Sequence, residues 1–144
     1  MTKPMSALLS AQRPSWYRLL GTVALFGSGL VWSPGVLSAD RPMAVWYYAD
    51  WCMNCKLIAP KIAAVQPDYE ARVDFVKLDV TDAAGKAHSQ QRARELGILS
   101  LYMDNTATGW LALVDRNGRQ VGELRQQMTL EQMRGALDRL APPQ

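Results

Sequence analysis

The sequence predicts an α/β domain in which helices cover both faces of a central mixed β-sheet. Three features lead to this class. An apolar strand at residues 43–48 and an alternating strand at 73–80 flank a helical segment, and an apolar hairpin follows at 110–125. A strand–helix–strand unit places its strands in parallel through a right-handed crossover, and the hairpin adds two antiparallel strands.

The first half of the domain alternates strand and helix. The run VWYY within residues 43–48 is rich in β-branched and aromatic side chains, so it predicts a buried strand. Residues 52–66 predict a helix, in which Pro60 should cause a kink because it removes a hydrogen bond. The apolar face of this helix carries Leu57, Ile58, Ile62 and Val65. Residues 73–80 alternate strictly and predict the next strand.

The second half begins with a polar helix, predicted at residues 86–96 and closed by Gly97. Residues 98–108 show no clear period and are expected to form an irregular connection. The segment 110–125 then predicts a β-hairpin, with DRNG as its turn.

The last helix has a clear start signal. Thr129 is a helix-capping residue, and Gln132 three positions later completes a capping box. The expected inner face carries Leu130, Met133, Leu137 and Leu140. Spacing of this kind indicates that the helix packs against the sheet.

The chain begins with the pattern of an export signal. Residues 1–39 carry three positive charges and no acidic residue, and residues 19–37 are uncharged. Small residues lead to a possible cleavage point after Ala39. The segment is either a cleaved signal peptide or an uncleaved membrane anchor, and a buried helix of the domain is a third possibility. Both export interpretations deliver residues 40–144 outside the cytoplasm, to the periplasm.

The charge distribution argues against nucleic acid as a partner. The net charge is +3, and all of it comes from the leader. Residues 40–144 contain thirteen basic and thirteen acidic residues. Without an excess of positive charge, the domain is not expected to bind a phosphate backbone.

The only two cysteines, Cys52 and Cys55, permit four interpretations. A zinc site needs about four ligands, and the chain adds only His88, so no metal is expected. Two unrelated thiols are disfavoured in an oxidising compartment. A structural disulfide that spans two residues stabilises a fold weakly, because it removes little entropy from the unfolded chain. A redox pair is the fourth interpretation.

The position of the pair favours redox chemistry. The strand at 43–48 leads into a helix that begins near Cys52, and the first turn of a helix has unpaired N–H groups. A thiolate there is stabilised, so the pKa of Cys52 should fall below its ordinary value. Cys55, one turn later, should be less accessible. C-x-x-C at the junction of a strand and a helix predicts thiol–disulfide exchange.

The segment ADWCMNCKLIAP resembles the active site of the thioredoxin superfamily. That family places W-C-x-x-C-K at this junction and a proline five residues later, which here is Pro60. YADWC followed by CK is most similar to its exported branch, which includes the C-terminal domain of DsbD-type proteins and membrane-anchored thioredoxin-like proteins of thylakoids and cyanobacteria. The likeness extends over about residues 43–140.

The resemblance implies a thioredoxin-like three-layer fold and a role for each motif residue. Cys52 would attack, Cys55 would resolve, and the two would form a redox-active Cys52–Cys55 disulfide. Trp51 would pack and dock partners, although it could also be a core aromatic. Lys56 either raises the local positive potential or is simply solvated. No cofactor is implied.

Two positions depart from the family pattern. Thioredoxins carry a buried acid six residues before the first cysteine, and Trp46 occupies that place. Asp50 is the nearest carboxylate, either as a loop acid at the helix N-terminus or as a proton acceptor for Cys55. The family also places a cis-proline opposite the pair, where this chain has Gly109 preceded by Thr108.

The sequence therefore predicts an exported thiol:disulfide oxidoreductase. Its partners would be protein disulfides, as in cytochrome c maturation, and a membrane or periplasmic thiol that supplies electrons. It would be soluble in the periplasm or anchored to the inner membrane by residues 19–37. The alternative is a redox-inactive thioredoxin-like module with a structural Cys52–Cys55 disulfide, which docks a membrane partner.

Overall fold

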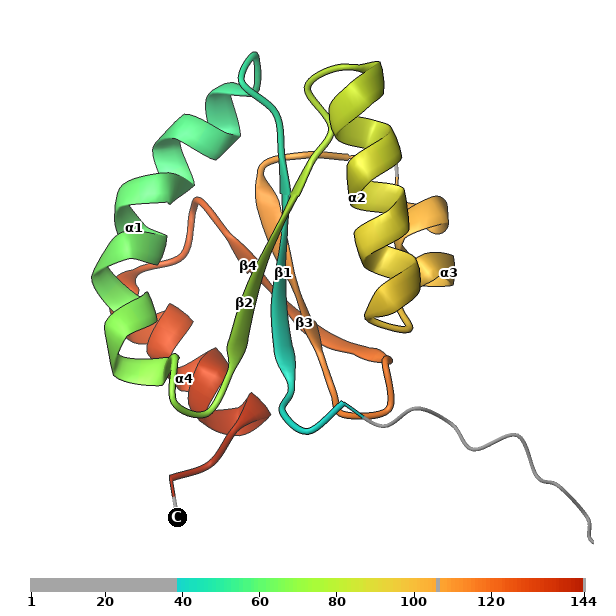
Figure 1. Ribbon diagram of the computed structural model, residues 1–144. Helices are drawn as coiled ribbons and strands as arrows, with labels where there is room; N and C mark the ends of the chain where they lie inside the picture. The colour runs from blue at the N-terminus through green and yellow to red at the C-terminus, as the bar shows by residue number, and fades with distance from the viewer. Residues whose placement is uncertain (1–38, 106, 144) are drawn as a thin grey trace, which may run out of the picture. The chain divides into compact units, whose positions relative to one another are not determined.

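The computed structural model describes residues 39–105 and 107–143 (Figure 1). Its elements are β1 (Met43–Tyr48), α1 (Met53–Tyr69), β2 (Asp74–Asp79), α2 (Ala83–Glu95), α3 (Leu99–Asp104), β3 (Trp110–Val114), β4 (Gln120–Arg125) and α4 (Leu130–Leu140). Within the described residues the sheet has four strands in the order β2-β1-β3-β4. The predicted order of elements is confirmed, with α3 as an addition.

The sheet is mixed, as predicted. Strand β1 pairs in parallel with β2 and antiparallel with β3, and β3 pairs antiparallel with β4. Helices α1 and α4 lie on one face, and α2 and α3 lie on the other, which makes three layers (Figure 1). The predicted three-layer α/β architecture is therefore confirmed.

Strand β1 is central, and both of its faces are buried. Ala44 belongs to the core cluster under α1 and α4, whereas Val45 and Tyr47 belong to the cluster under α2 and α3. Alternate residues of a strand point to opposite faces, so a nearly continuous apolar run is what a strand between two helical layers requires. This burial fixes the carboxyl end of β1. Residues 49–52, called the cysteine loop below, connect that end to α1.

Three helix boundaries differ from the predictions. Helix α1 starts at Met53, with Cys52 as its N-cap, and continues through Pro60 to Tyr69, beyond the expected end. Both prolines of this helix lie on its solvent side, where a lost backbone hydrogen bond can be replaced by water. Helix α2 starts three residues early, because the Asp82 side chain caps it by accepting the Gly85 N–H at 2.7 Å.

The expectation of an irregular connection at residues 98–108 was wrong in part, because α3 lies within it. Tertiary contacts support this short helix. Tyr102 stacks on Tyr47 with ring centroids 6.4 Å apart, and its hydroxyl donates to the carbonyl of Lys86. The Tyr47 hydroxyl donates in turn to the carbonyl of Leu101. A six-residue helix held in this way has no periodicity to detect.

Two leucines assigned to inner faces are largely on the surface. Leu57 is 49% exposed and Leu130 is 37% exposed, because each lies at the edge of its helix's apolar stripe. The other inner-face residues are buried or pack against the core: Ile58, Ile62, Val65, Met133, Leu137 and Leu140. The predicted capping box of α4 is confirmed by both of its hydrogen bonds.

Across residues 39–105 and 107–143, no helix is long and apolar enough to span a membrane. The predicted leader lies outside the described residues, apart from Ala39. The Ala39 N–H donates to the carbonyl of Arg116 at 2.9 Å. The first described residue is thus fastened to the end of the domain opposite the cysteine loop.

Candidate active site

The cysteine pair lies where β1 gives way to α1. The chain turns after Ala49, whose carbonyl accepts the Cys52 N–H at 3.1 Å. Cys52 then caps α1, and its Sγ accepts the Cys55 N–H at 3.1 Å. Both cysteines are free thiols. Cys52 is 7% exposed and Cys55 is fully buried, so the predicted difference in access is confirmed.

The environment of Cys52 favours its thiolate. Burial opposes ionisation, but hydrogen bonds from the Cys55 and Thr108 side chains and from the backbone N–H groups of Cys55 and Asn54 outweigh it and lower the pKa. The predicted direction is therefore confirmed. The backbone donors are the unpaired N–H groups of the first turn of a helix.

Cys55 behaves in the opposite way. Burial, followed by its hydrogen bond to Cys52, raises the pKa of the Cys55 thiol to about 11. The Cys55 Sγ lies 3.7 Å from the carbonyl oxygen of Tyr47, which is a second acceptor within reach of the same proton. The site therefore pairs one activated thiol near the surface with one buried thiol that retains its proton.

Gly109 lies directly against the pair, as its place in the chain predicts. Its N–H donates to the carbonyl of Tyr47 at 3.0 Å, and its φ is +89°. A Cβ on this residue would lie 2.4 Å from the Asn54 Cβ and 3.1 Å from the Cys52 Sγ. Only glycine combines the left-handed backbone with this close approach. Thr108, the residue before it, hydrogen-bonds Cys52 and so joins the site.

Trp51 is a surface residue. Its side chain is 66% exposed, and its Nε1–H donates to the carbonyl of Thr81 at 3.2 Å. The possibility of a plain core aromatic is therefore wrong. Met53 and Leu57, also exposed, extend the apolar surface along α1 from Cys52.

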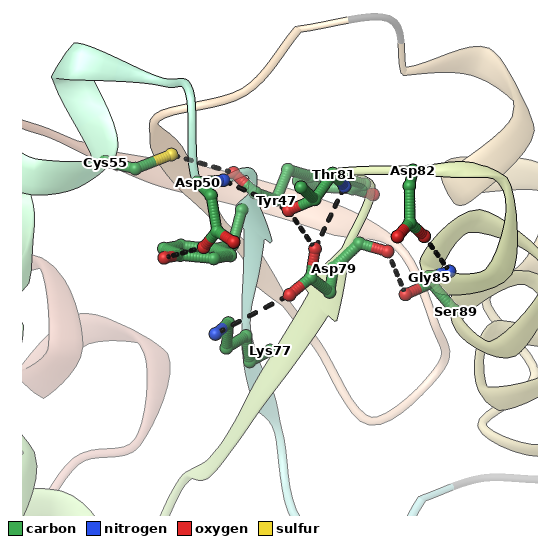
Figure 2. A network of polar contacts seen from close by, with 10 residues as sticks. Tyr47, Asp50, Cys55, Lys77, Asp79, Thr81, Asp82, Gly85 and Ser89 are labelled. Atoms are coloured by element: carbon green, nitrogen blue, oxygen red, sulfur yellow. Dashed lines mark hydrogen bonds and ion pairs between the residues drawn. The ribbon is translucent and has the colours of Figure 1, made fainter.

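A polar network fastens the cysteine loop to the end of β2 (Figure 2). The Asp50 N–H donates to the Thr81 Oγ1 at 3.0 Å. Thr81 in turn donates to the Asp79 carboxylate through its hydroxyl and its N–H. These two bonds, aided by Lys77, hold the pKa of Asp79 below its ordinary value. The Ser89 hydroxyl donates to the Asp79 carbonyl, so the network also reaches α2.

Within residues 39–105 and 107–143, no hydrogen bond joins the Asp50 carboxylate to either thiol. Its carboxylate accepts the Tyr48 hydroxyl at 2.5 Å. Tyr48 itself packs against the small buried cluster that contains Cys52 and Cys55. Asp50 is therefore connected to the pair through a neighbouring side chain.

Trp46 fills the place of the missing acid. It packs on the cysteine cluster and meets the Tyr48 ring edge-on, with centroids 5.1 Å apart. Its Nε1–H is buried and donates to no acceptor among the described residues. An indole is a donor only, so it cannot accept a proton from Cys55.

Lys56 and Pro60 lie on the exposed side of α1. The Lys56 N–H donates to the Cys52 carbonyl at 3.3 Å, but no described contact joins the Lys56 or Pro60 side chain to either thiol. His88 is exposed on α2. Within residues 39–105 and 107–143, no group of three or more His, Cys, Asp or Glu side chains could hold a metal ion.

Tyr48, Thr81 and Asp79 belong to the site but were not predicted from the sequence. A usable signal was present: parallel strands end at the same edge of a sheet, so the residues after β2 had to lie beside those after β1. Hydrogen bonds between the loops could not be foreseen from that rule. The structure also adds an open cavity of about 570 Å³ beside Thr108, bounded by α2 and by Tyr102 and Met103 of α3.

Residues 29–109 match the family model described as Thioredoxin, which is more than half of the chain. The chain belongs to the thioredoxin family. The match includes the strand–helix junction with both cysteines and ends at Gly109. Strands β3 and β4 and helix α4, which follow Gly109, lie outside this match and are assigned to the same domain because they complete its sheet and core.

Three curated relatives are similar to parts of the chain. The thiol:disulfide interchange protein TxlA of Synechococcus elongatus is 48% identical over 44 residues, 31% of this chain and 23% of that protein. Thioredoxin C-2 of Corynebacterium nephridii is 35% identical over 48% of this chain and 63% of its own. The chloroplastic thioredoxin-like protein HCF164 of Oryza sativa subsp. japonica is 31% identical over 61% and 29%.

The chain thus spans less than two thirds of each of these relatives. Among solved structures, MTB dsbF in its mixed oxidized and reduced forms superposes with a TM-score of 0.51. The two are 18% identical, and the superposition covers 72% of this chain and 83% of the other. At this level of identity the likeness supports the fold.

Proposed function

We propose that this protein is a thiol:disulfide oxidoreductase that exchanges or reduces protein disulfides outside the cytoplasm. The observation that carries the proposal is the opposite behaviour of the two thiols: Cys52 keeps a small exposed fraction of 7% and has a lowered pKa, whereas Cys55 is fully buried and has a raised one. Exchange requires one thiol whose thiolate form is favoured, so that it attacks first, and a second thiol that attacks afterwards. A structural disulfide requires neither.

The reaction follows from this arrangement. The Cys52 thiolate attacks one sulfur of a client disulfide, that S–S bond breaks, and the other client sulfur leaves as a thiolate. Cys55 then loses its proton and attacks the Cys52 Sγ, 3.1 Å from its own backbone nitrogen. The Cys52–Cys55 disulfide forms and the second client sulfur leaves. The client gains two electrons, which a membrane or periplasmic thiol must return to the pair.

The surroundings of Cys52 suit a polypeptide client. The exposed side chains of Trp51, Met53 and Leu57 offer apolar contact on one side. A second surface is the cavity lined by Thr108, the residue that hydrogen-bonds Cys52. A client sulfur bonded to Cys52 brings the client backbone to within about 6 Å of the Cys52 backbone, so flanking residues reach both surfaces.

The cellular site is proposed from the leader and from relatives. Residues 1–39 have the order of a signal peptide or membrane anchor, with domain residues 40–144 on the far side of the membrane. One relative is named a chloroplastic thioredoxin-like protein, which is compatible with a role in a compartment outside the cytoplasm. Maturation of exported cysteine proteins, including c-type cytochromes, fits this placement.

The decisive experiment measures reduction of a protein disulfide by the purified full-length protein, together with its reduction potential. Cys52→Ser should abolish turnover, because no thiolate remains at the surface. Cys55→Ser should instead accumulate a mixed disulfide with the client, visible on a non-reducing gel. A potential of roughly −120 to −270 mV is the range of catalytic pairs, whereas one below about −300 mV indicates a structural disulfide. Unchanged activity in Cys52→Ser would overturn the proposal.

A further inference from the structure

Cys55 needs a proton acceptor that its motif does not provide. The thiol is fully buried, and its pKa of about 11 keeps it protonated at neutral pH. It must lose that proton before it can attack the mixed disulfide. Trp46, which stands where the family has an acid, carries only an N–H donor. Another group must take the proton.

Tyr48 contacts both the buried cysteine cluster and an exposed carboxylate. Its ring packs against the cluster of Ala49, Cys52 and Cys55, and its hydroxyl donates to the Asp50 carboxylate at 2.5 Å. This bond, followed by burial and by nearby negative charge, raises the pKa of Tyr48 to about 12. A phenol of that kind keeps its own proton at neutral pH. It can therefore accept a proton only while passing another to Asp50.

The charged groups around Tyr48 come from three elements. From β2, the Lys77 ammonium lies 3.5 Å from the centroid of the Tyr48 ring and 3.8 Å from the Asp79 carboxylate. From α1, Cys55 acts on the phenol electrostatically. From the loop after β1, Asp50 is exposed and can release a proton to water. Lys77 over the ring face favours extra negative charge on the phenol oxygen during transfer.

We propose that Tyr48 and Asp50 together accept the proton of Cys55 in the step that resolves the mixed disulfide. The Cys55 proton moves to the Tyr48 oxygen as the Tyr48 proton moves to Asp50. The Cys55 thiolate then forms the Cys52–Cys55 bond and the client sulfur leaves with the electron pair of the broken bond. Asp50 returns the proton to water. The inference rests on the proposed function and supplies its missing acid–base partner.

The experiment follows one turnover of the reduced full-length protein with an aromatic disulfide that releases a coloured thiolate. A first release reports attack by Cys52, and a second reports attack by Cys55. Asp50→Asn and Tyr48→Phe should each leave the first phase intact and slow the second about 10²-fold at neutral pH, the lower range for general-base catalysis. Asp50→Glu should restore much of the rate. Asp104→Asn, which removes an exposed carboxylate from α3, should behave like wild type.

The pH profile separates proton transfer from a structural role. As the pH approaches 11, Cys55 ionises without help, so the second phases of the variants and of wild type should converge. Slowing by the same factor at every pH, or a second phase unchanged in both variants, would overturn the proton route. Loss of the first phase from wild type would instead overturn the proposed function. Tyr48→Phe keeps the ring and its packing, so it serves if Asp50→Asn disturbs the loop.

Discussion

Two segments meet at the Cys52 sulfur, and they are specified in different ways. The segment of residues 49–55, which includes the first turn of α1, carries its chemistry as a motif. Its place at the start of the helix lowers the pKa of Cys52 and buries Cys55. The segment at Thr108 and Gly109 carries no motif; it contributes one hydroxyl and the absence of a side chain. The two reactive thiols can therefore be identified from a sequence motif. The segment that faces them is specified by how closely it packs against Cys52 and Asn54, which no motif records.

The largest expected effect tests the space at Gly109. Gly109→Ala should lower the free energy of unfolding by about 3 kcal/mol, from a left-handed backbone and a Cβ forced against Asn54. Gly97→Ala is the matched control, because Gly97 has φ +71° but nothing within 4 Å of the added Cβ. It should cost only about 1 kcal/mol. Urea unfolding measures both, and equal losses would show that the close approach does not matter.

The second prediction tests the thiol that the loop buries. An unfolded cysteine ionises near ~8.5, but folded Cys55 holds its proton to about pH 11. Between these values the unfolded chain binds fewer protons than the folded one, so stability falls as pH rises, by up to about 1.4 kcal/mol per pH unit. The pKa of Cys52 is shifted in the opposite direction. Its contribution to folding stability is already complete in this alkaline range and is lost only as pH falls through the lowered pKa.

Urea unfolding of the reduced protein at several alkaline pH values measures this loss. Cys55→Ser is the control, since it lacks the thiol while other titrating groups remain. The wild-type curve should fall more steeply than that of the variant. Parallel curves would mean that burial of Cys55 has little influence on its proton.

The smallest expected effect tests the hydroxyl that the second segment contributes. Thr108→Val keeps the shape but removes the hydrogen bond to Cys52, so the pKa of Cys52 should rise. Alkylation of Cys52 at neutral pH should slow about tenfold, the value of a hydrogen bond to a charged group. Thr108→Ser should restore the rate. If Thr108→Val reacts as fast as wild type, the backbone donors of α1 suffice alone.

The sequence predicts most of the fold because its strands and long helices have strong local signals. The alternation of β2 and the capping of α4 by Thr129 can be predicted from residues that are adjacent or nearly adjacent in the sequence. Helix α3 is not, because its support comes from Tyr47 and Lys86, far away in the chain. The prediction that Leu57 is buried was also wrong. Periodicity shows which residues form the apolar stripe of a helix, but not how much of that stripe the neighbouring elements cover.

The same division applies to the site. Sequence by itself determined that Cys52 and Cys55 stand at the start of a helix, and helix geometry then sets which thiol is exposed and which pKa falls. Tertiary structure alone decided that Thr81 holds the loop, that Tyr48 packs on the cysteine cluster and donates to Asp50, and that Gly109 has no room for a side chain. The physical reason is distance along the chain. Local hydrogen bonds follow from neighbouring residues, whereas contacts between distant segments exist only after the sheet has brought its strand ends together.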